Sequence, residues 1–331
     1  MPEPDRTQAP ATAAPSAASS PGSQSAGPSA ARAAGQSAGP GEAPALNHPP
    51  LPEALPRPVI DAHCHIDMRD GDRHGEDAAL TPEQALALAA SVNVTGIVQV
   101  GCSIRDVAAA VAMAEAHLGI LASIGIHPNE APRLAARGTL DAAIAEVERL
   151  AAGSTRVRGI GETGLDHYRT RDAADRAIQE EAFRAHIDLA RRLGLVLVIH
   201  DRDAHADVIR VLLDELAGAG LPEVVQFHCF SGDAAMARLA AEHGWYVSFA
   251  GTVTFRNARD LHAAAPVVPR DRILVETDAP YLTPTPHRGR VNASYLVPLT
   301  VRHLAELRGA DLAELCDDLH ANTVRAFGTW A

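Results

Sequence analysis

The fold of this chain is decided by the stretch Arg57-Pro58-Val59-Ile60-Asp61-Ala62-His63-Cys64-His65-Ile66-Asp67. Its apolar start predicts a β-strand that ends on two histidines. Alternate residues of a strand lie on one face, so His63 and His65 project to the same side and can hold one ion. A histidine-rich strand end without metal explains this pair equally well. Asp67 lies one strand step past His65, where it would orient that ring or make an ordinary turn.

The bulk composition limits the classes of protein to consider. The chain has 331 residues, 47% of them hydrophobic, which is enough for a large α/β core. It contains no run of about 18 apolar residues, so we expect no membrane association. Its first residues lack the basic and apolar regions of a signal peptide, and we therefore expect a cytoplasmic protein. No obligate protein partner is predicted.

The charged residues and cysteines exclude several chemistries. The net charge of −12 excludes a broad basic surface for nucleic acid, so a phosphate-bearing substrate would need metal ions and a local group of arginines. Lysine is absent and all 29 basic residues are arginine, which excludes a Schiff-base lysine and a carboxylated lysine between two metals. The four cysteines are scattered, which predicts free thiols.

Two parts of the chain differ in composition. Residues 1–57 are rich in Ala, Pro, Ser and Gly and have few large apolar side chains. Such a segment cannot bury enough surface to offset the entropy of ordering it. The sequence therefore predicts a disordered tail over 1–57 and one folded domain over 58–331.

Within 58–331, short apolar runs alternate with helical patterns. The expected strands are 58–62, 95–101, 119–125, 156–161, 195–200, 223–228, 245–250 and 272–278. The expected helices are 82–92, 104–118, 139–152, 174–193, 203–218, 232–243, 256–264, 294–308 and 311–326. Eight β–α repeats predict a (β/α)8 TIM barrel. An open doubly wound sheet would leave two edge strands, for which the sequence shows no short or charge-guarded candidates.

Metal-capable side chains follow six of these strands. They are His63 and His65, His127, Glu162 and Asp166, His200, His228, and Asp278. The carboxyl ends of barrel strands meet at one face, where catalytic groups gather. The run Gly159-Ile-Gly161-Glu-Thr-Gly164 also matches a dinucleotide fingerprint, but it falls in mid-chain and sets a carboxylate where a pyrophosphate would sit. We therefore interpret that match as spurious.

These motifs resemble the TatD family of metal-dependent hydrolases, within the amidohydrolase-like TIM barrels. The similarity covers about 60–328 and excludes the tail. Its motifs are His63-Cys-His65-Ile-Asp67, Gly125-Ile-His127-Pro128, Gly161-Glu-Thr-Gly-Leu-Asp166, Val198-Ile-His200, His228-Cys-Phe-Ser-Gly232, Ser248-Phe-Ala-Gly-Thr-Val-Thr-Phe255, Glu276-Thr-Asp278-Ala-Pro-Tyr-Leu282 and Pro286-His-Arg-Gly289.

The resemblance implies roles for individual residues. His63 and His65 would hold a first divalent ion, His200 and His228 a second, and Glu162 would bridge the two. Asp278 would bind the first ion and accept a proton from the attacking water. His127 and Asp166 would line the substrate pocket or support the ligands. Imidazole ligands favour Zn or Mn over Mg, whereas the family typically uses Mg, so the metal identity stays open among Mg, Mn and Zn.

Family members are typically deoxyribonucleases that act from a 3′ end, which implies single-stranded DNA or another phosphodiester as substrate. Three arginines in loops near the strand ends, Arg169, Arg202 and Arg288, would hold its phosphates, although an ordinary surface role explains them equally well. A hydrolase of small amides, lactones or esters would use the same ions, so this alternative stays open. A non-catalytic binding protein is the third reading, and the intact ligand set argues against it.

Overall fold

The computed structural model describes residues 48–66 and 80–330. Eight strands form one sheet whose order follows the chain, and every neighbouring pair is parallel. Their bounds are Val59–Cys64 (β1), Val94–Gly101 (β2), Ile120–Ile124 (β3), Val157–Asp166 (β4), Val196–Arg202 (β5), Val225–Phe227 (β6), Tyr246–Phe249 (β7) and Ile273–Val275 (β8). Asp67 and residues 1–47 lie outside the described residues.

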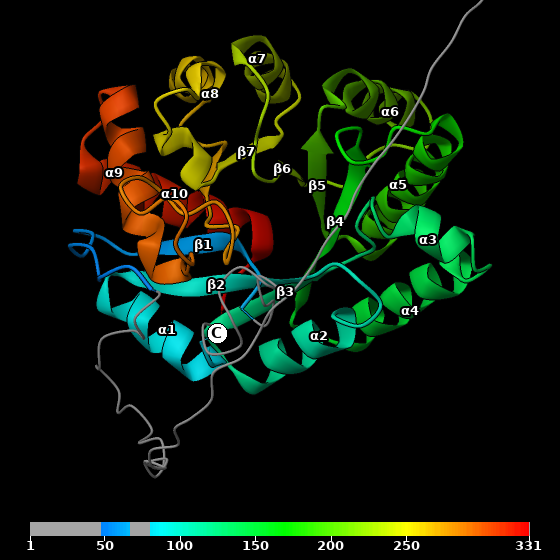
Figure 1. Cartoon of the computed structure of the whole chain (residues 1–331), viewed down its shortest axis with the longest axis horizontal. Helices are drawn as coiled ribbons and strands as arrows, with labels where there is room; N and C mark the ends of the chain where they lie inside the picture. The colour runs from blue at the N-terminus through cyan, green and yellow to red at the C-terminus, as the bar shows by residue number, and fades with distance from the viewer. Residues whose placement is uncertain (1–47, 67–79, 331) are drawn as a thin grey trace, which may run out of the picture. The chain divides into compact units, whose positions relative to one another are not determined.

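The sheet curls until its first and last strands meet. The amide of Asp278 donates to the carbonyl of His63 over 2.9 Å, and the amide of His65 donates to the carbonyl of Ala279 over 2.8 Å. These bonds join the carboxyl end of β1 to the segment after β8. The predicted TIM barrel is confirmed, with helices arranged around the strands (Figure 1).

Helices follow the strands as the periodicity predicts. Their bounds are Pro82–Ser91 (α1), Val107–Ala116 (α2), Ala131–Ala135 (α3), Leu140–Gly153 (α4), Ala173–Leu193 (α5), His205–Ala217 (α6), Ala234–Glu242 (α7), Arg259–Ala264 (α8), Val297–Arg308 (α9) and Leu312–Phe327 (α10), with 3-10 turns at Gly251–Thr254 (η3), Ala265–Val267 (η4) and Ser294–Leu296 (η5). Only the five-residue α3 has no counterpart among the expected helices. The capping box of Thr81 and Gln84 explains why α1 begins where it does.

Two apolar layers support the barrel. Inside it, side chains such as Val98, Leu121 and Leu274 form a narrow core. Ala326 and Phe327, from the end of α10, belong to the same core and close the barrel at its amino end. A larger layer fills the space between the strands and the surrounding helices. The carboxyl ends of the strands are thereby left as the face on which a site can form.

The folded part begins earlier than the sequence predicts. Residues 48–57, which composition assigns to the tail, pack against the barrel, and Leu55 is buried in the core. Hydrogen bonds hold this segment: the carbonyl of Pro49 accepts from the Tyr295 hydroxyl over 2.6 Å, and that of Ala54 accepts from Arg302 over 3.0 Å. One apolar anchor and backbone carbonyls leave little compositional signal. The boundary at 57 is therefore wrong, while disorder over 1–47 stays a prediction.

None of the helices in the described part of the chain is long and apolar enough to cross a membrane.

Candidate metal centre

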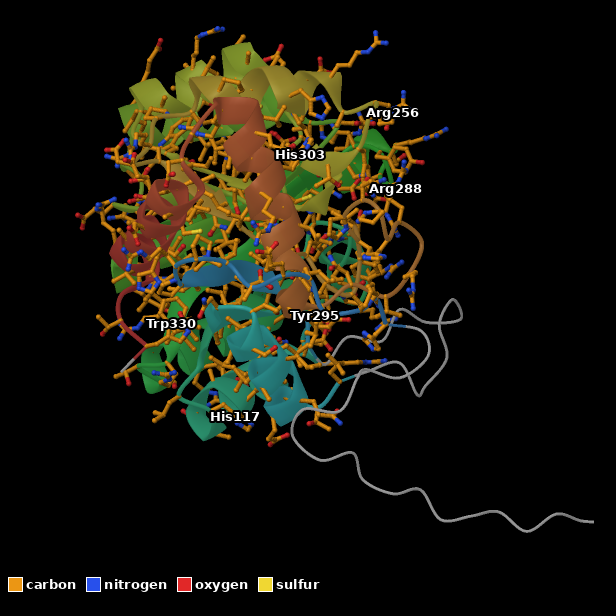
Figure 2. The ribbon with its side chains drawn as sticks, turned by 90° about the vertical axis from the view of Figure 1, so that its left-hand side faces the viewer. His117, Arg256, Arg288, Tyr295, His303 and Trp330 are labelled. Atoms are coloured by element: carbon orange, nitrogen blue, oxygen red, sulfur yellow. The ribbon has the colours of Figure 1, made fainter. Side chains whose placement is uncertain are left out.

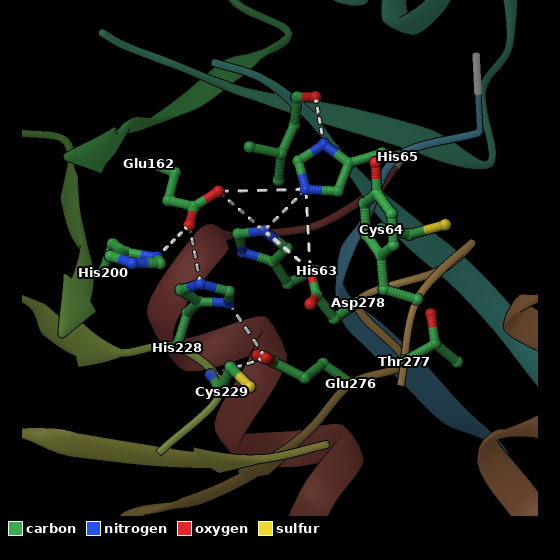
Figure 3. A network of polar contacts seen from close by, with 12 residues as sticks. His63, Cys64, His65, Glu162, His200, His228, Cys229, Glu276, Thr277 and Asp278 are labelled. Atoms are coloured by element: carbon green, nitrogen blue, oxygen red, sulfur yellow. Dashed lines mark hydrogen bonds and ion pairs between the residues drawn. The ribbon is translucent and has the colours of Figure 1, made fainter. Parts of the chain in front are cut away.

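The six predicted ligands converge at the carboxyl end of the barrel (Figure 3). His63 and His65 come from the end of β1, Glu162 from β4, His200 from β5, and His228 and Asp278 from the residues after β6 and β8. All of them are buried except His200 and Asp278, which are partly exposed. Residues up to 215 positions apart in the sequence thus form one polar cluster, because parallel strands all end at one face.

A first group of ligand atoms surrounds one point. The Nε2 atoms of His63 and His65 lie 3.3 Å apart. Oδ1 of Asp278 lies 3.8 Å and 3.6 Å from these two nitrogens, and Oε2 of Glu162 lies 3.7 Å and 3.8 Å from them. A cation bound at about 2.1 Å by four ligands separates them by roughly 3.4 Å, so these spacings fit a metal ion.

A second group forms around the other oxygen of Glu162. Oε1 lies 2.5 Å from Nδ1 of His200, 3.0 Å from Nε2 of His228 and 3.5 Å from Nε2 of His127. Glu162 therefore presents one carboxylate oxygen to each of two histidine groups. This is the arrangement that a carboxylate bridging two cations requires.

Glycines place Glu162 in this position. The register of β4 against β5 shifts between Ile160 and Thr163, which turns the Glu162 side chain into the barrel mouth. Gly161 and Gly164 flank it, both with φ of 139°, and a Cβ at Gly161 would lie 2.2 Å from the Val198 carbonyl oxygen. Only glycine fits there. The spurious dinucleotide fingerprint is thus the sequence signature of this irregular strand.

The hydrogen bonds of the rings show which nitrogens are available to a metal. Nδ1 of His65 lies 3.0 Å from the Val100 carbonyl, and Nδ1 of His228 lies 3.1 Å from Oε1 of Glu276. Because these oxygens accept, each Nδ1 carries the proton and each neutral ring turns an Nε2 lone pair to the centre. Lone pairs then face carboxylate oxygens. A bound cation is the group that satisfies such a set of acceptors, so the donor set fits divalent metal.

His127 differs from the other rings. Its Nδ1 accepts the backbone amide of Asn129 over 3.0 Å, so in the neutral ring the proton is on Nε2. That Nε2 faces Glu162 as a donor rather than as a ligand. His127 therefore belongs to the wall of the site, where it can donate a hydrogen bond to a bound anion.

Asp166 supports the site from behind. It is 1% exposed, its Oδ1 accepts the amide of Arg169 over 2.8 Å, and its Oδ2 accepts Nδ2 of Asn129 over 2.8 Å. Oδ2 also lies 3.5 Å from Nε2 of His200. Burial alone would raise the pKa of this carboxyl, but the bonds from His200 and the Arg169 amide lower it well below its usual range. This placement favours orientation of His200 over contact with substrate.

Glu276 is a site residue that the sequence prediction missed. It is fully buried and accepts from His228, from the amide of Cys229 over 2.6 Å and from the Ser248 hydroxyl over 2.5 Å. These bonds fix the tautomer and direction of the His228 ring. The available signal was its spacing: Glu276 precedes Asp278 by two residues, directly after an apolar strand.

Asp61 was missed in the same way. It is fully buried and accepts both the amide and the hydroxyl of Thr277, over 2.9 Å and 2.6 Å. It thereby connects the strand that carries His63 to the segment that carries Asp278. Burial raises the pKa of Asp61 to about 7, against the bonds from Thr277. A charged residue two positions before His63, on the same strand face, was the signal.

In this cluster, burial and neighbouring charges shift the pKa values of the side chains in opposite directions. Burial raises the pKa of Glu162, but the surrounding histidines, His228 first, lower it well below its usual range. Burial likewise lowers the pKa of His200, yet the neighbouring Glu162 raises it to about 9. Metal binding must displace protons from such histidines, so metal affinity should fall as pH falls.

The three predicted substrate arginines are all exposed at the carboxyl face: Arg202 ends β5, and Arg169 and Arg288 follow β4 and β8. The guanidinium of Arg202 lies 4.1 Å from the ring centre of Tyr168, and that of Arg288 lies 3.9 Å from the ring centre of Phe255. Arg169 is exposed beside the first pair. The contacts of the three arginines with a substrate stay predictions.

Comparison with known proteins identifies the family. The family described as TatD related DNase matches residues 60–328. A Mycobacterium tuberculosis protein named "uncharacterized metal-dependent hydrolase TatD" is 43% identical over 82% of this chain and 98% of its own length. The Cronobacter sakazakii "3′-5′ ssDNA/RNA exonuclease TatD" is 35% identical over 74% of this chain and 91% of its own.

A solved structure agrees with these sequence relatives. The TatD homologue YJJV from Escherichia coli K12 has a TM-score of 0.71 and 25% identity, and the match covers 82% of this chain and 98% of that one. The family match over residues 60–328 contains every strand end that contributes to the cluster. The chain therefore belongs to the TatD family of metal-dependent hydrolases.

Proposed function

We propose that this protein is a divalent-metal-dependent deoxyribonuclease that shortens single-stranded DNA from its 3′ end. The observation that carries the proposal is the bridging position of Glu162, with one oxygen turned to each histidine group. Paired cations suit phosphodiester hydrolysis because they stabilise both the attacking and the leaving oxygen. The name of the Cronobacter relative, an exonuclease, supports the same reaction.

In this proposal His63, His65 and Asp278 would hold one ion, His200 and His228 would hold the other, and Glu162 would serve both. The ions would be Mg, Mn or Zn. When bound, they would lower the pKa of a water molecule and neutralise charge on the phosphate. The protein supplies the fixed directions of its ligands, through Glu276 behind His228 and Val100 behind His65.

In the same proposal, Asp278 would take the proton of the attacking water. Burial raises the pKa of its carboxyl, but the contact with His65 and the other nearby histidines lower it below its usual value, so the group is ionised at neutral pH. Its side chain is 15% exposed, which leaves it open to the mouth of the site. His127, with its proton on Nε2, would donate to a phosphate oxygen on the opposite side.

Cleavage of a 5′-labelled single-stranded DNA oligonucleotide tests the proposal. The protein is stripped with a chelator, and Mg, Mn and Zn are returned one at a time. We expect a ladder that shortens progressively from the 3′ end, which Glu162→Gln abolishes and a 3′-terminal phosphorothioate blocks. Lack of cleavage by protein shown to carry bound metal would contradict the proposal and point to small amides or lactones.

A further inference from the structure

Two arginine–aromatic pairs stand on the carboxyl face of the barrel. The first joins Tyr168, just after β4, to Arg202 at the end of β5; it is tied by a bond of 2.9 Å from the His167 amide to the Arg202 carbonyl. The second joins Phe255, just after η3, to Arg288 in the segment after β8. Both arginines are exposed, and Tyr168 is 53% exposed.

Such pairs present two kinds of binding group together. The stacked guanidinium is held in place while its N–H groups stay free to contact a phosphate. The remaining face or edge of the ring is available to a nucleobase, whose stacking on an aromatic residue stabilises a complex whatever the base.

The two pairs lie on different sides of the metal centre. One is built on the neighbouring strands β4 and β5 and the other on the segments after β7 and β8, with β6 between them on one side and β1–β3 on the other. The centre itself takes ligands from β1, β4, β5 and the segments after β6 and β8. Figure 2 shows Arg288 extending from the edge of the molecule together with Arg256.

We propose that the two pairs bind the nucleotides on either side of the cleaved bond, and that they select an unpaired strand. This proposal rests on the proposed function and adds the residues that bind the substrate strand. A base must leave its stack to contact a ring, which an unpaired strand permits and a duplex does not. Local contacts are needed because the net charge of −12 repels nucleic acid, so the affinity for a strand has to come from residues at the site.

The chain offers a matched control pair. Arg272 lies over the ring of Tyr246, with 5.4 Å from guanidinium carbon to ring centre, at the amino ends of β7 and β8. It is an arginine–aromatic pair on the opposite face of the barrel, with a tyrosine that is buried rather than exposed. Substitution there tests whether loss of any such pair disturbs the protein.

Binding of a fluorescent oligo-dT strand tests the proposal, measured by anisotropy with metal present in an Asp278→Asn background that prevents turnover. We expect Tyr168→Leu and Phe255→Leu each to raise Kd about tenfold without changing its salt dependence. Arg202→Gln and Arg288→Gln should raise Kd and reduce the slope of log Kd against log salt by about 0.7. Arg272→Gln should leave both quantities unchanged, and a duplex should compete poorly.

The proposal would be overturned if all four substitutions in the two pairs left Kd unchanged. It would also be overturned if they weakened the binding of duplex DNA as much as that of the single strand. Where the Asp278→Asn protein binds no strand, the KM of the same variants in the active enzyme decides instead, with the same expected pattern. The two proposals fail separately. If the two pairs contribute to binding but the protein does not cleave DNA, only the deoxyribonuclease assignment fails. If the protein cleaves DNA but the four substitutions leave its affinity unchanged, only the role of the two pairs fails.

Discussion

The two ends of the barrel bury polar groups in opposite ways. At the amino end, the guanidinium of Arg156 donates to the carbonyls of Ala114, Leu118, Ile120 and Trp330 over 2.5–3.1 Å. Every contact pairs a donor with acceptors. At the carboxyl end, the neutral rings of His65 and His228 turn Nε2 lone pairs toward the carboxylate oxygens of Asp278 and Glu162, so that acceptors converge on one place. Paired polar groups indicate structure, and converging acceptors indicate a site for a cation.

The contrast predicts the largest effect for Asp278→Asn. The amide keeps the shape of the carboxylate but cannot accept a proton, so we expect kcat to fall by about 10³-fold or more. Thermal unfolding should change by only a few degrees, because no paired structural group is lost. Activity close to that of the wild type would show that Asp278 is not the proton acceptor.

Arg156→Met should have the reverse effect. It removes charge-assisted hydrogen bonds that join the α2–β3 segment to Trp330, and we expect the free energy of unfolding to fall by about 3 kcal/mol. Urea unfolding measures this change. The kcat of the folded variant should match that of the wild type. A stable variant with reduced turnover would contradict the division between the two ends.

His186 extends the comparison to a histidine with both nitrogens paired. Its Nε2 accepts the Ile126 amide over 3.1 Å and its Nδ1 donates to the Ala182 carbonyl over 2.7 Å. Burial lowers its pKa to about 4 from 6.5. Above pH 6.5 the ring is neutral whether folded or unfolded. Between pH 6.5 and 4 only the unfolded chain takes up the proton, so the free energy of unfolding decreases as the pH is lowered through this range.

This linkage should cost about 3 kcal/mol of unfolding free energy between pH 6.5 and 4. His186→Gln keeps an acceptor for the Ile126 amide and does not titrate. The difference in unfolding free energy between wild type and variant, measured across this pH range, isolates the contribution. A difference that stays constant with pH would show that His186 does not titrate in this range.

Glu276→Gln should have the smallest effect. It keeps the volume of the side chain but weakens the hold on the protonated Nδ1 of His228, which lowers the basicity of the ligand atom. We expect metal affinity at the His228 side to fall about tenfold, within the range seen for such supporting residues. Calorimetric titration of metal-free protein measures it. Ser248→Ala removes one of the other donors to Glu276, and its metal affinity should lie between those of Glu276→Gln and the wild type.

The sequence predicted the barrel well because each strand and helix has a local signal. The apolar run Val196–Ile199 and the Thr81 cap are readable residue by residue, and eight repeats leave few alternatives. It indicated the proposed ligands for the same reason: His200 and His228 follow apolar runs of the sequence directly. It missed α3, whose five residues are too few to show a period, and it missed the packed segment 48–57, whose contacts use backbone carbonyls.

The supporting residues were harder to predict. Glu276 and Asp61 matter through hydrogen bonds to His228 and Thr277, which depend on the closure of the barrel and not on neighbouring residues in sequence. For Asp166 the sequence left substrate contact and support of the ligands both open, and its contacts with the Arg169 amide and with His200 favour support. The difference between a ligand and its support lies in the three-dimensional contacts of each side chain, which no pattern of residue types encodes.

The number of divalent ions bound per chain tests the central claim most directly. Metal-free wild-type protein and Glu162→Ala are each titrated with Mn²⁺ by calorimetry, and the ions retained are then counted by elemental analysis. The bridging position of Glu162 predicts two ions per wild-type chain and loss of at least one in the variant. A single ion in the wild type, or two in Glu162→Ala, would contradict a centre built around that carboxylate.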